Sequence, residues 1–108
     1  MASARVFLYA EYQVSIPFAQ IDWTAINIEM KKFPGLVSKT WLSGLNTHSV
    51  GGFYEFESRE SAQKYIDGLL IPFAAQVQGN LAVRLFDAEA TKAASIGINS
   101  PFYAETDN

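Results

Sequence analysis

The chain has 108 residues, a length that predicts one domain. Its formal net charge is -3 and it has no basic run, which argues against a nucleic-acid partner because phosphate neutralisation needs clustered lysine and arginine. Without cysteine it can form neither disulfides nor thiolate metal sites. No apolar stretch approaches the roughly 20 residues of a membrane span, and the N-terminus lacks a signal-peptide core. The sequence therefore predicts a soluble, cytoplasmic protein without a membrane partner.

The first predicted strand covers residues 4–13, which are rich in β-forming side chains on both faces. A helix is expected to begin at Trp23, because Asp22 is a good N-terminal cap, and to end at the Pro34-Gly35 turn. The helical spacing of its apolar residues predicts a buried stripe made of Trp23, Ile26, Met30 and Phe33.

Residues 36–43 and 50–57 are short apolar runs with turn residues on both sides, a pattern that predicts a β-hairpin. Gly51-Gly52 opens the second run, where it predicts a bulge or the close approach of a neighbouring chain. The double glycine does not match a phosphate-binding loop, because a strand follows it instead of a helix.

Ser58 can cap a second helix, and Pro72 should end or kink that helix before one or two further turns at residues 73–77. A last strand is predicted at residues 81–87, followed by a short helix at residues 88–95. The buried stripe of the second helix should contain Ala62, Tyr65, Ile66 and Leu69.

The predicted order of elements is strand, helix, strand, strand, helix, strand, which is the split βαβ, or ferredoxin-like, arrangement. The fold class is α+β, with an antiparallel sheet and both helices on one face, over residues 1–87. The other face would carry bulky apolar side chains that a second copy can cover, which predicts a homodimer and a dimeric α/β barrel. The C-terminal extension, residues 88–108, is expected to dock on the domain or on the partner subunit.

A run that begins at the Pro34-Gly35 turn resembles the YdhR-type monooxygenases of the dimeric α/β-barrel superfamily. The resemblance covers roughly residues 5–87 and implies a cofactor-independent monooxygenase that acts on a phenol, quinol or polyketide-like substrate without metal or flavin. The positions that carry it are Trp41, His48, Gly51-Gly52, Tyr54, Phe56 and Ser61-Ala62.

The resemblance brings forward Trp41, His48 and Tyr54 as the candidate catalytic residues. His48 can deprotonate a phenol, because histidine changes charge near neutral pH, or it is a loop residue without a chemical role. Trp41 can stack on a planar substrate or pair with Tyr54 across the hairpin, and Tyr54 can reach a cavity or remain a sheet residue. A lone histidine without HxH or ExxH spacing predicts no metal site.

The candidate substrate-binding residues are Tyr9, Tyr65 and Arg84. With the last strand beside the first and the first beside the third, Arg84 shares a face with Glu11 and Glu55. These three charges can then meet, either to fix the register at a dimer interface or to hold an anionic substrate.

Three functions stay open at this point. The first is the cofactor-free oxygenase, which predicts an apolar pocket between the helices and the sheet with a candidate catalytic residue at its wall. The second is a non-catalytic dimeric module that binds a hydrophobic small molecule. The third is an isomerase or decarboxylase on the same scaffold, because one fold can host several chemistries.

Overall fold

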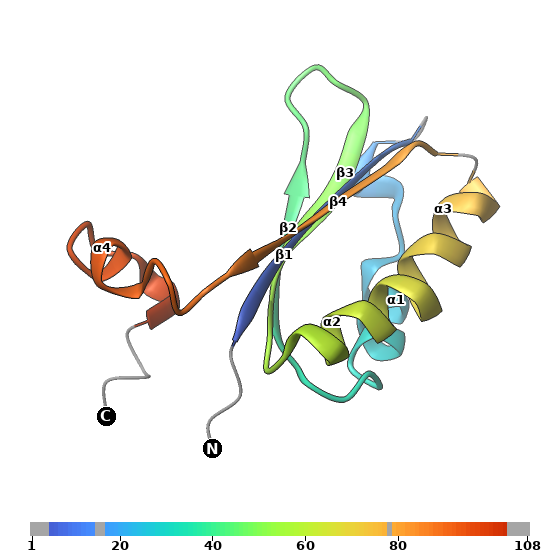
Figure 1. Ribbon diagram of the computed structural model, residues 1–108. Coiled ribbons are helices and arrows are strands. Elements are labelled where there is room, and N and C mark those ends of the chain that lie inside the picture. The colour runs from blue at the N-terminus through green and yellow to red at the C-terminus, as the bar shows by residue number, and fades with distance from the viewer. Residues whose placement is uncertain (1–4, 15–16, 78, 104–108) are drawn as a thin grey trace.

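The computed structural model describes residues 5–14, 17–77 and 79–103 of the chain. Its elements are β1 (Val6–Gln13), the 3-10 turn η1 (Phe18–Gln20), α1 (Trp23–Met30), β2 (Leu36–Ser43), β3 (Ser49–Phe56), α2 (Arg59–Tyr65), the π-helical turn η2 (Ile66–Leu70), α3 (Ile71–Val77), β4 (Leu81–Asp87) and α4 (Lys92–Ile96). The four strands form one antiparallel sheet in the order β2-β3-β1-β4, and α1, α2 and α3 lie on one side of it (Figure 1). The predicted α+β, ferredoxin-like arrangement is confirmed. Ala4, the expected start of the first strand, and residues 104–108 lie outside the described residues.

Helix α1 begins where the sequence predicts. The Asp22 carboxylate accepts a hydrogen bond from the Ala25 N–H at 3.3 Å, which satisfies one of the free donors of the first turn. The predicted stripe is correct at Met30, which is buried, and wrong at Trp23, whose side chain is 48% exposed. Trp23 lies one turn before Ile26, the first α1 side chain that packs against the core, and remains outside that core.

A β-bulge at the start of β2 decides which of its side chains face the helices. The pairing of β2 with β3 shifts by one residue between Leu36 and Ser38. Because side chains alternate along a strand, the extra residue lets Leu36 face the helices together with Lys39 and Trp41. Gly52 lies opposite Trp41, and a Cβ on it would lie only 2.5 Å from Cε of Lys39. The glycine therefore leaves room for the lysine side chain.

The neighbouring Gly51 has a different role. A Cβ there would overlap the carbonyl oxygen of Ala10 on β1, so the two strands can pair at this point only around a glycine. The close approach at the double glycine is made by β1 of the same chain and not by a neighbouring chain, and the bulge lies in β2 and not at the glycines.

Helices α2 and α3 form one continuous segment through η2. Ser58 caps it, since its side chain accepts from the Ser61 N–H at 3.1 Å. The Ile71 N–H donates to the Ile66 carbonyl, five residues back, just before Pro72. Pro72 has no N–H to donate and its ring would crowd the carbonyl four residues earlier, so the wider turn accommodates it. The helix therefore continues to residue 77 and does not end at the proline.

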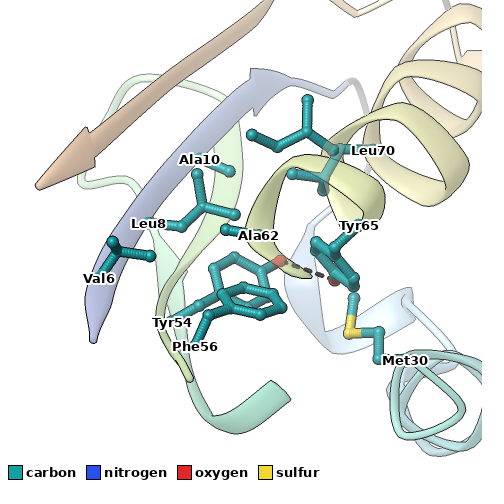
Figure 2. Close-up of a cluster of buried hydrophobic side chains, with 10 residues drawn as sticks. Val6, Leu8, Ala10, Met30, Tyr54, Phe56, Ala62, Tyr65 and Leu70 are labelled. Atoms are coloured by element: carbon teal, nitrogen blue, oxygen red, sulfur yellow. Dashed lines mark hydrogen bonds between the residues drawn. The ribbon is translucent and has the colours of Figure 1, made fainter. Parts of the chain in front are cut away.

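The main core fills the space between the sheet and α1–α3. Figure 2 shows the Tyr65 hydroxyl pointing at that of Tyr54, to which it donates a hydrogen bond at 3.1 Å. Each large side chain buried here contributes about 1.5–3 kcal/mol through removal of apolar surface from water. The buried members are Val6, Leu8, Ala10, Met30, Tyr54, Phe56, Ala62, Tyr65, Ile66 and Leu70.

The C-terminal segment, residues 88–103, lies at the start of β1 and away from α1–α3 (Figure 1). Tyr103 is buried, with its ring 5.8 Å from that of Phe7 and its hydroxyl donating to the Ala88 carbonyl at 2.7 Å. Phe102 lies 5.0 Å from Phe53 between ring centroids. We call Phe7, Phe53, Phe102 and Tyr103 the aromatic patch; it covers part of the helix-free face of the sheet.

Two ion pairs accompany the aromatic patch. Nη1 of Arg5 lies 2.6 Å from the Glu55 carboxylate, and its Nε lies 2.9 Å from the Glu89 carboxylate. Glu55 belongs to β3 and Glu89 follows β4, so one arginine joins the sheet to the C-terminal segment.

None of the helices built from the described residues combines the length and the apolar character that crossing a membrane requires.

Candidate functional site

A hollow of about 540 Å³ opens between α1, the η2–α3 segment and the sheet; we call it the central hollow. Tyr12 of β1 and Tyr54 of β3 reach it from the sheet, and Phe73 closes one side with its ring 5.4 Å from that of Tyr12. Glu29 is the acidic residue at its wall, and its side chain is largely exposed. The apolar and aromatic lining suits a small planar molecule.

A second hollow of about 220 Å³ lies between α1 and β2 and shares Met30 with the central hollow. We call it the lysine hollow, because Lys39 lines it together with Trp41 and Asn27. The Lys39 amine lies 3.2 Å from the ring centroid of Trp41 and 4.9 Å from that of Tyr54. It donates to the Met30 sulfur at 3.5 Å. The amine therefore lies in the lysine hollow, beside Met30 and Tyr54, which line the central hollow.

The electrostatic setting of Lys39 differs from that of an ordinary surface lysine. Burial lowers the pKa of Lys39 to about 7, because a charged amine is disfavoured away from water. Within the described residues, no carboxylate forms an ion pair with it. The Trp41 and Tyr54 ring faces favour the ammonium form once a proton arrives. Lys39 can therefore gain or lose a proton near neutral pH.

Trp41 is fixed in place from two sides. Its indole N–H donates to the Asn27 side-chain oxygen at 3.0 Å, and its ring lies 5.4 Å from that of Phe18. The alternative in which Trp41 pairs with Tyr54 across the hairpin is wrong, because Gly52 lies opposite Trp41 and Lys39 lies opposite Tyr54. These partners follow from the register at the hairpin loop, where Ser43 lies opposite Val50. Trp41 instead forms the wall of the lysine hollow and the surface on which the amine rests.

Tyr54 and Tyr65 form a buried pair behind the central hollow (Figure 2). Burial raises the pKa of both phenols well above the ordinary tyrosine value, so both stay neutral near physiological pH. Tyr54 lines the central hollow, whereas Tyr65 contacts Tyr54 and Phe33 from the side of α2. Tyr54 can therefore touch a ligand directly, and Tyr65 acts through Tyr54.

His48 lies in the β2–β3 loop, away from both hollows. Its side chain is exposed and lines a separate depression with Phe18 and Asn46. Its backbone has φ 50°, a left-handed conformation, and its carbonyl accepts from the Val14 N–H at 2.9 Å. Of the three candidate catalytic residues, the structure brings Trp41 and Tyr54 together through Lys39 and leaves His48 apart from them.

The other two candidate substrate-binding residues lie on the helix-free face. Tyr9 and Arg84 are directly opposite each other on β1 and β4. The Tyr9 hydroxyl donates to the Glu11 carboxylate, a bond that raises the pKa of Tyr9 and lowers that of Glu11. Arg84 is exposed. Neither side chain reaches the central hollow, because both point away from the helices.

The predicted meeting of Glu11, Glu55 and Arg84 is wrong. Glu55 lies opposite Phe7, whereas Arg84 lies opposite Tyr9, two residues further along β1. The Glu55 carboxylate is instead bound by Arg5, a residue just before β1. The alternation of side chains along the strands correctly predicted that the three charges share one face of the sheet. The pairing register of the strands, however, keeps them apart.

Sequence reasoning missed Lys39, Asn27 and Arg5. A signal for Lys39 was present: a lysine stands inside an apolar strand, and a double glycine opens the partner strand and leaves space opposite. Asn27 gives no such signal, because a polar residue on a helix is ordinary. No three or more histidine, aspartate or glutamate side chains of the described chain gather into a group that could hold a metal ion.

Comparison with known proteins gives a family and a fold. A family model described as "Putative mono-oxygenase ydhR" matches residues 10–96. No curated protein sequence matches significantly. Among solved structures, SnoaB from Streptomyces nogalater, described as a cofactor-independent oxygenase, is similar with a TM-score of 0.60 and 15% identity, over 80% of this chain and 94% of that one.

Two further structures are similar. A conserved protein from Methanosarcina mazei Go1 has a TM-score of 0.58 and 12% identity, over 80% of this chain and 94% of that one. The ActVA-Orf6 monooxygenase from Streptomyces coelicolor, solved with nanaomycin D, has a TM-score of 0.52 and 13% identity, over 80% and 88%. At these identities the structures establish a shared fold, and the family model covers most of the sequence, so the chain belongs to the YdhR mono-oxygenase family.

Proposed function

We propose that this protein is a cofactor-independent monooxygenase that oxidises a small aromatic substrate carrying a hydroxyl group. The observation that carries the proposal is the central hollow. It has the size of a small-molecule site, and its polar groups are few beside its aromatic and aliphatic wall. The family match and the similarity to SnoaB, described as a cofactor-independent oxygenase, support the class of reaction.

The proposed reaction uses dioxygen as its oxidant. Loss of the hydroxyl proton gives an electron-rich phenolate, which passes electrons to dioxygen and forms a carbon–oxygen bond at a ring carbon. The resulting hydroperoxide then loses water, as its O–O bond and the C–H bond of that carbon break. One oxygen atom stays in the quinone product and the other leaves in water. The protein must supply a binding site for the substrate, a proton acceptor for its hydroxyl group, and exclusion of bulk water.

The proposal includes a homodimer. On the helix-free face, the aromatic patch leaves Phe86 48% exposed and Leu42 36% exposed. Both lie on the side of the sheet opposite α1–α3, and exposed apolar side chains on a sheet favour an interface. A second copy would cover them and hold the sheet rigid beneath the hollow. Sedimentation should show a dimer at micromolar concentration, and Phe86→Glu should shift it toward monomer.

The decisive experiment measures oxygen uptake by the purified protein with a panel of electron-rich phenols and hydroquinones. We expect quinone formation with one oxygen consumed per substrate. Saturable binding without chemical change would instead select a binding module. A product formed without oxygen uptake would select an isomerase or decarboxylase. A matched variant, Ala25→Trp, should fill the mouth of the central hollow and reduce turnover without disturbing the buried core, since Ala25 is exposed.

A further inference from the structure

Lys39 places a basic group on the side of the sheet that is otherwise filled by apolar and aromatic side chains. Its position opposite Tyr54 places it on the helix side of the sheet, and Gly52 leaves space for its methylene chain. A site that needed only bulk would be better filled by leucine or methionine, because burying an amine without a carboxylate partner costs stability. Packing therefore does not account for a lysine at this position.

We infer that the Lys39 amine is the proton acceptor for the hydroxyl group of an aromatic substrate bound between α1 and the sheet. The inference rests on the proposed function and names the base of that reaction. The amine lines the lysine hollow and lies 3.5 Å from the sulfur of Met30 and 4.9 Å from the ring centroid of Tyr54, and both of these residues line the central hollow. A substrate ring in the central hollow can direct a hydroxyl past Met30 toward this amine.

The described charged groups around Lys39 do not form an ion pair with its amine, so the amine can accept a proton from a substrate. From α1, Lys31 lines the lysine hollow, and the Glu29 carboxylate binds Lys32 at 3.0 Å. Burial lowers the pKa of Lys39 and so favours the neutral amine near neutral pH. Within the described chain, no anion compensates the Lys39 charge. The remaining titratable groups that face this region from β1, β3 and α2 are the neutral phenols of Tyr12, Tyr54 and Tyr65.

Proton transfer from substrate to Lys39 produces an ammonium and a phenolate without changing the net charge of the site. In a partly dry site, these opposite charges attract more strongly than in water. The ammonium then lies over the face of Trp41, which Asn27 holds in place through the indole N–H. After oxygen transfer, the same proton can return to the departing hydroxide and complete the water molecule.

The test uses 2-naphthol, whose ionised form absorbs at longer wavelength than the neutral phenol. At about pH 8 the Lys39 amine is mostly neutral, so bound naphthol should ionise without net proton release to a weakly buffered solution. The ionised fraction of bound naphthol should exceed that of free naphthol by at least about fivefold. In Lys39→Met the bound naphthol should stay neutral. In Lys39→Arg it should ionise and release its proton to solvent, because a guanidinium cannot accept one.

Lys32→Met is the matched control, because it removes an exposed lysine of the same region and should preserve the ionisation. If wild-type protein binds naphthol only as the neutral phenol, or does not bind it, the inference is overturned. It is also overturned if His48→Ala, and not Lys39→Met, removes the ionisation. Oxygen uptake is measured separately: ionisation without uptake rejects the proposed oxygenase and retains the amine as proton acceptor. Oxygen uptake with a bound phenol that stays neutral retains the proposed oxygenase and rejects the amine as proton acceptor.

Discussion

The two faces of the sheet each bury a basic side chain, and the two residues have opposite surroundings. On the helix-free face, Arg5 lies between the carboxylates of Glu55 and Glu89 at 2.6 and 2.9 Å. On the helix face, Lys39 has two aromatic rings and a sulfur as its neighbours. The first cation is compensated on two sides, and the second is not compensated by any described residue.

This difference separates a structural charge from a chemically available one. A paired arginine stays charged at any accessible pH and fixes the sheet to the C-terminal segment. An unpaired lysine beside an apolar hollow changes its protonation near neutrality, which is what acid–base chemistry requires. The comparison predicts that substitutions on the helix-free face destabilise the fold, whereas loss of Lys39 removes proton transfer without destabilising the fold.

The largest effect is expected from Tyr103→Ala, which removes a buried ring of the aromatic patch. It should lower the free energy of unfolding by about 4 kcal/mol, measured by urea denaturation, because the ring leaves a cavity beside Phe7. Tyr103→Phe keeps the ring and loses the hydrogen bond to Ala88, so its loss should be about 1 kcal/mol. Equal midpoints for wild type and Tyr103→Ala would mean that the C-terminal segment does not pack on the sheet in solution.

The next effect is expected from Arg5→Met, which leaves the buried Glu55 carboxylate without its cation. Breaking a buried ion pair from one side should cost about 3 kcal/mol in the free energy of unfolding. Glu89→Gln is the control: its side chain is 42% exposed, so its loss should stay below about 1 kcal/mol. If Arg5→Met unfolds no more easily than Glu89→Gln, the two faces do not differ in the way proposed.

Lys39→Met should raise the free energy of unfolding, whereas the two preceding substitutions lower it. Replacing an uncompensated amine by an apolar side chain of similar length should stabilise the protein by about 2 kcal/mol at low pH. The unfolded chain keeps the lysine proton up to its ordinary pKa of 10.5, whereas the folded chain releases it at about 7. The wild type therefore binds fewer protons when folded, and its stability rises with pH between these values.

The advantage of Lys39→Met should therefore be full below about pH 7 and disappear toward about pH 10. Urea denaturation of both proteins at several pH values in this window measures the difference. Burial raises the pKa of Tyr12, Tyr54 and Tyr65, so these phenols stay neutral in the folded protein across this window. A pH-independent difference would show that Lys39 carries its charge throughout, and it would make Lys39 resemble Arg5.

The sequence was sufficient for the elements that depend on spacing and local chemistry. The caps at Asp22 and Ser58, the hairpin and the last strand follow from residue types at fixed offsets, and the structure has them at those places. Strand order follows from the same list of elements. Pro72 was harder, because a proline can end a helix or be accommodated by a wider turn, and residue type alone does not choose between them.

The candidate site was less predictable because it depends on two long-range details. A one-residue bulge near Val37 places Leu36 on the same side of the sheet as Lys39 and Trp41, and nothing in the run of residue types marks it. The partner of Glu55 is likewise set by register, which brings it to Arg5 and not to Arg84. The side of the sheet on which a side chain lies can be predicted from the alternation along its strand. Its contact partner can be predicted only when the pairing register of the strands is known.

The smallest effect is expected at His48, which belongs to neither face. Its φ of 50° costs a non-glycine residue about 1 kcal/mol, and glycine avoids this strain but loses more entropy on folding. His48→Gly should therefore change the free energy of unfolding by less than about 1 kcal/mol, with a small gain as the expected direction. His48→Val should instead destabilise by more, because a β-branched side chain is poorly tolerated at positive φ. If urea denaturation ranks valine equal to glycine, the loop does not hold this backbone conformation in solution, and the separation of His48 from the Lys39 site loses its structural basis.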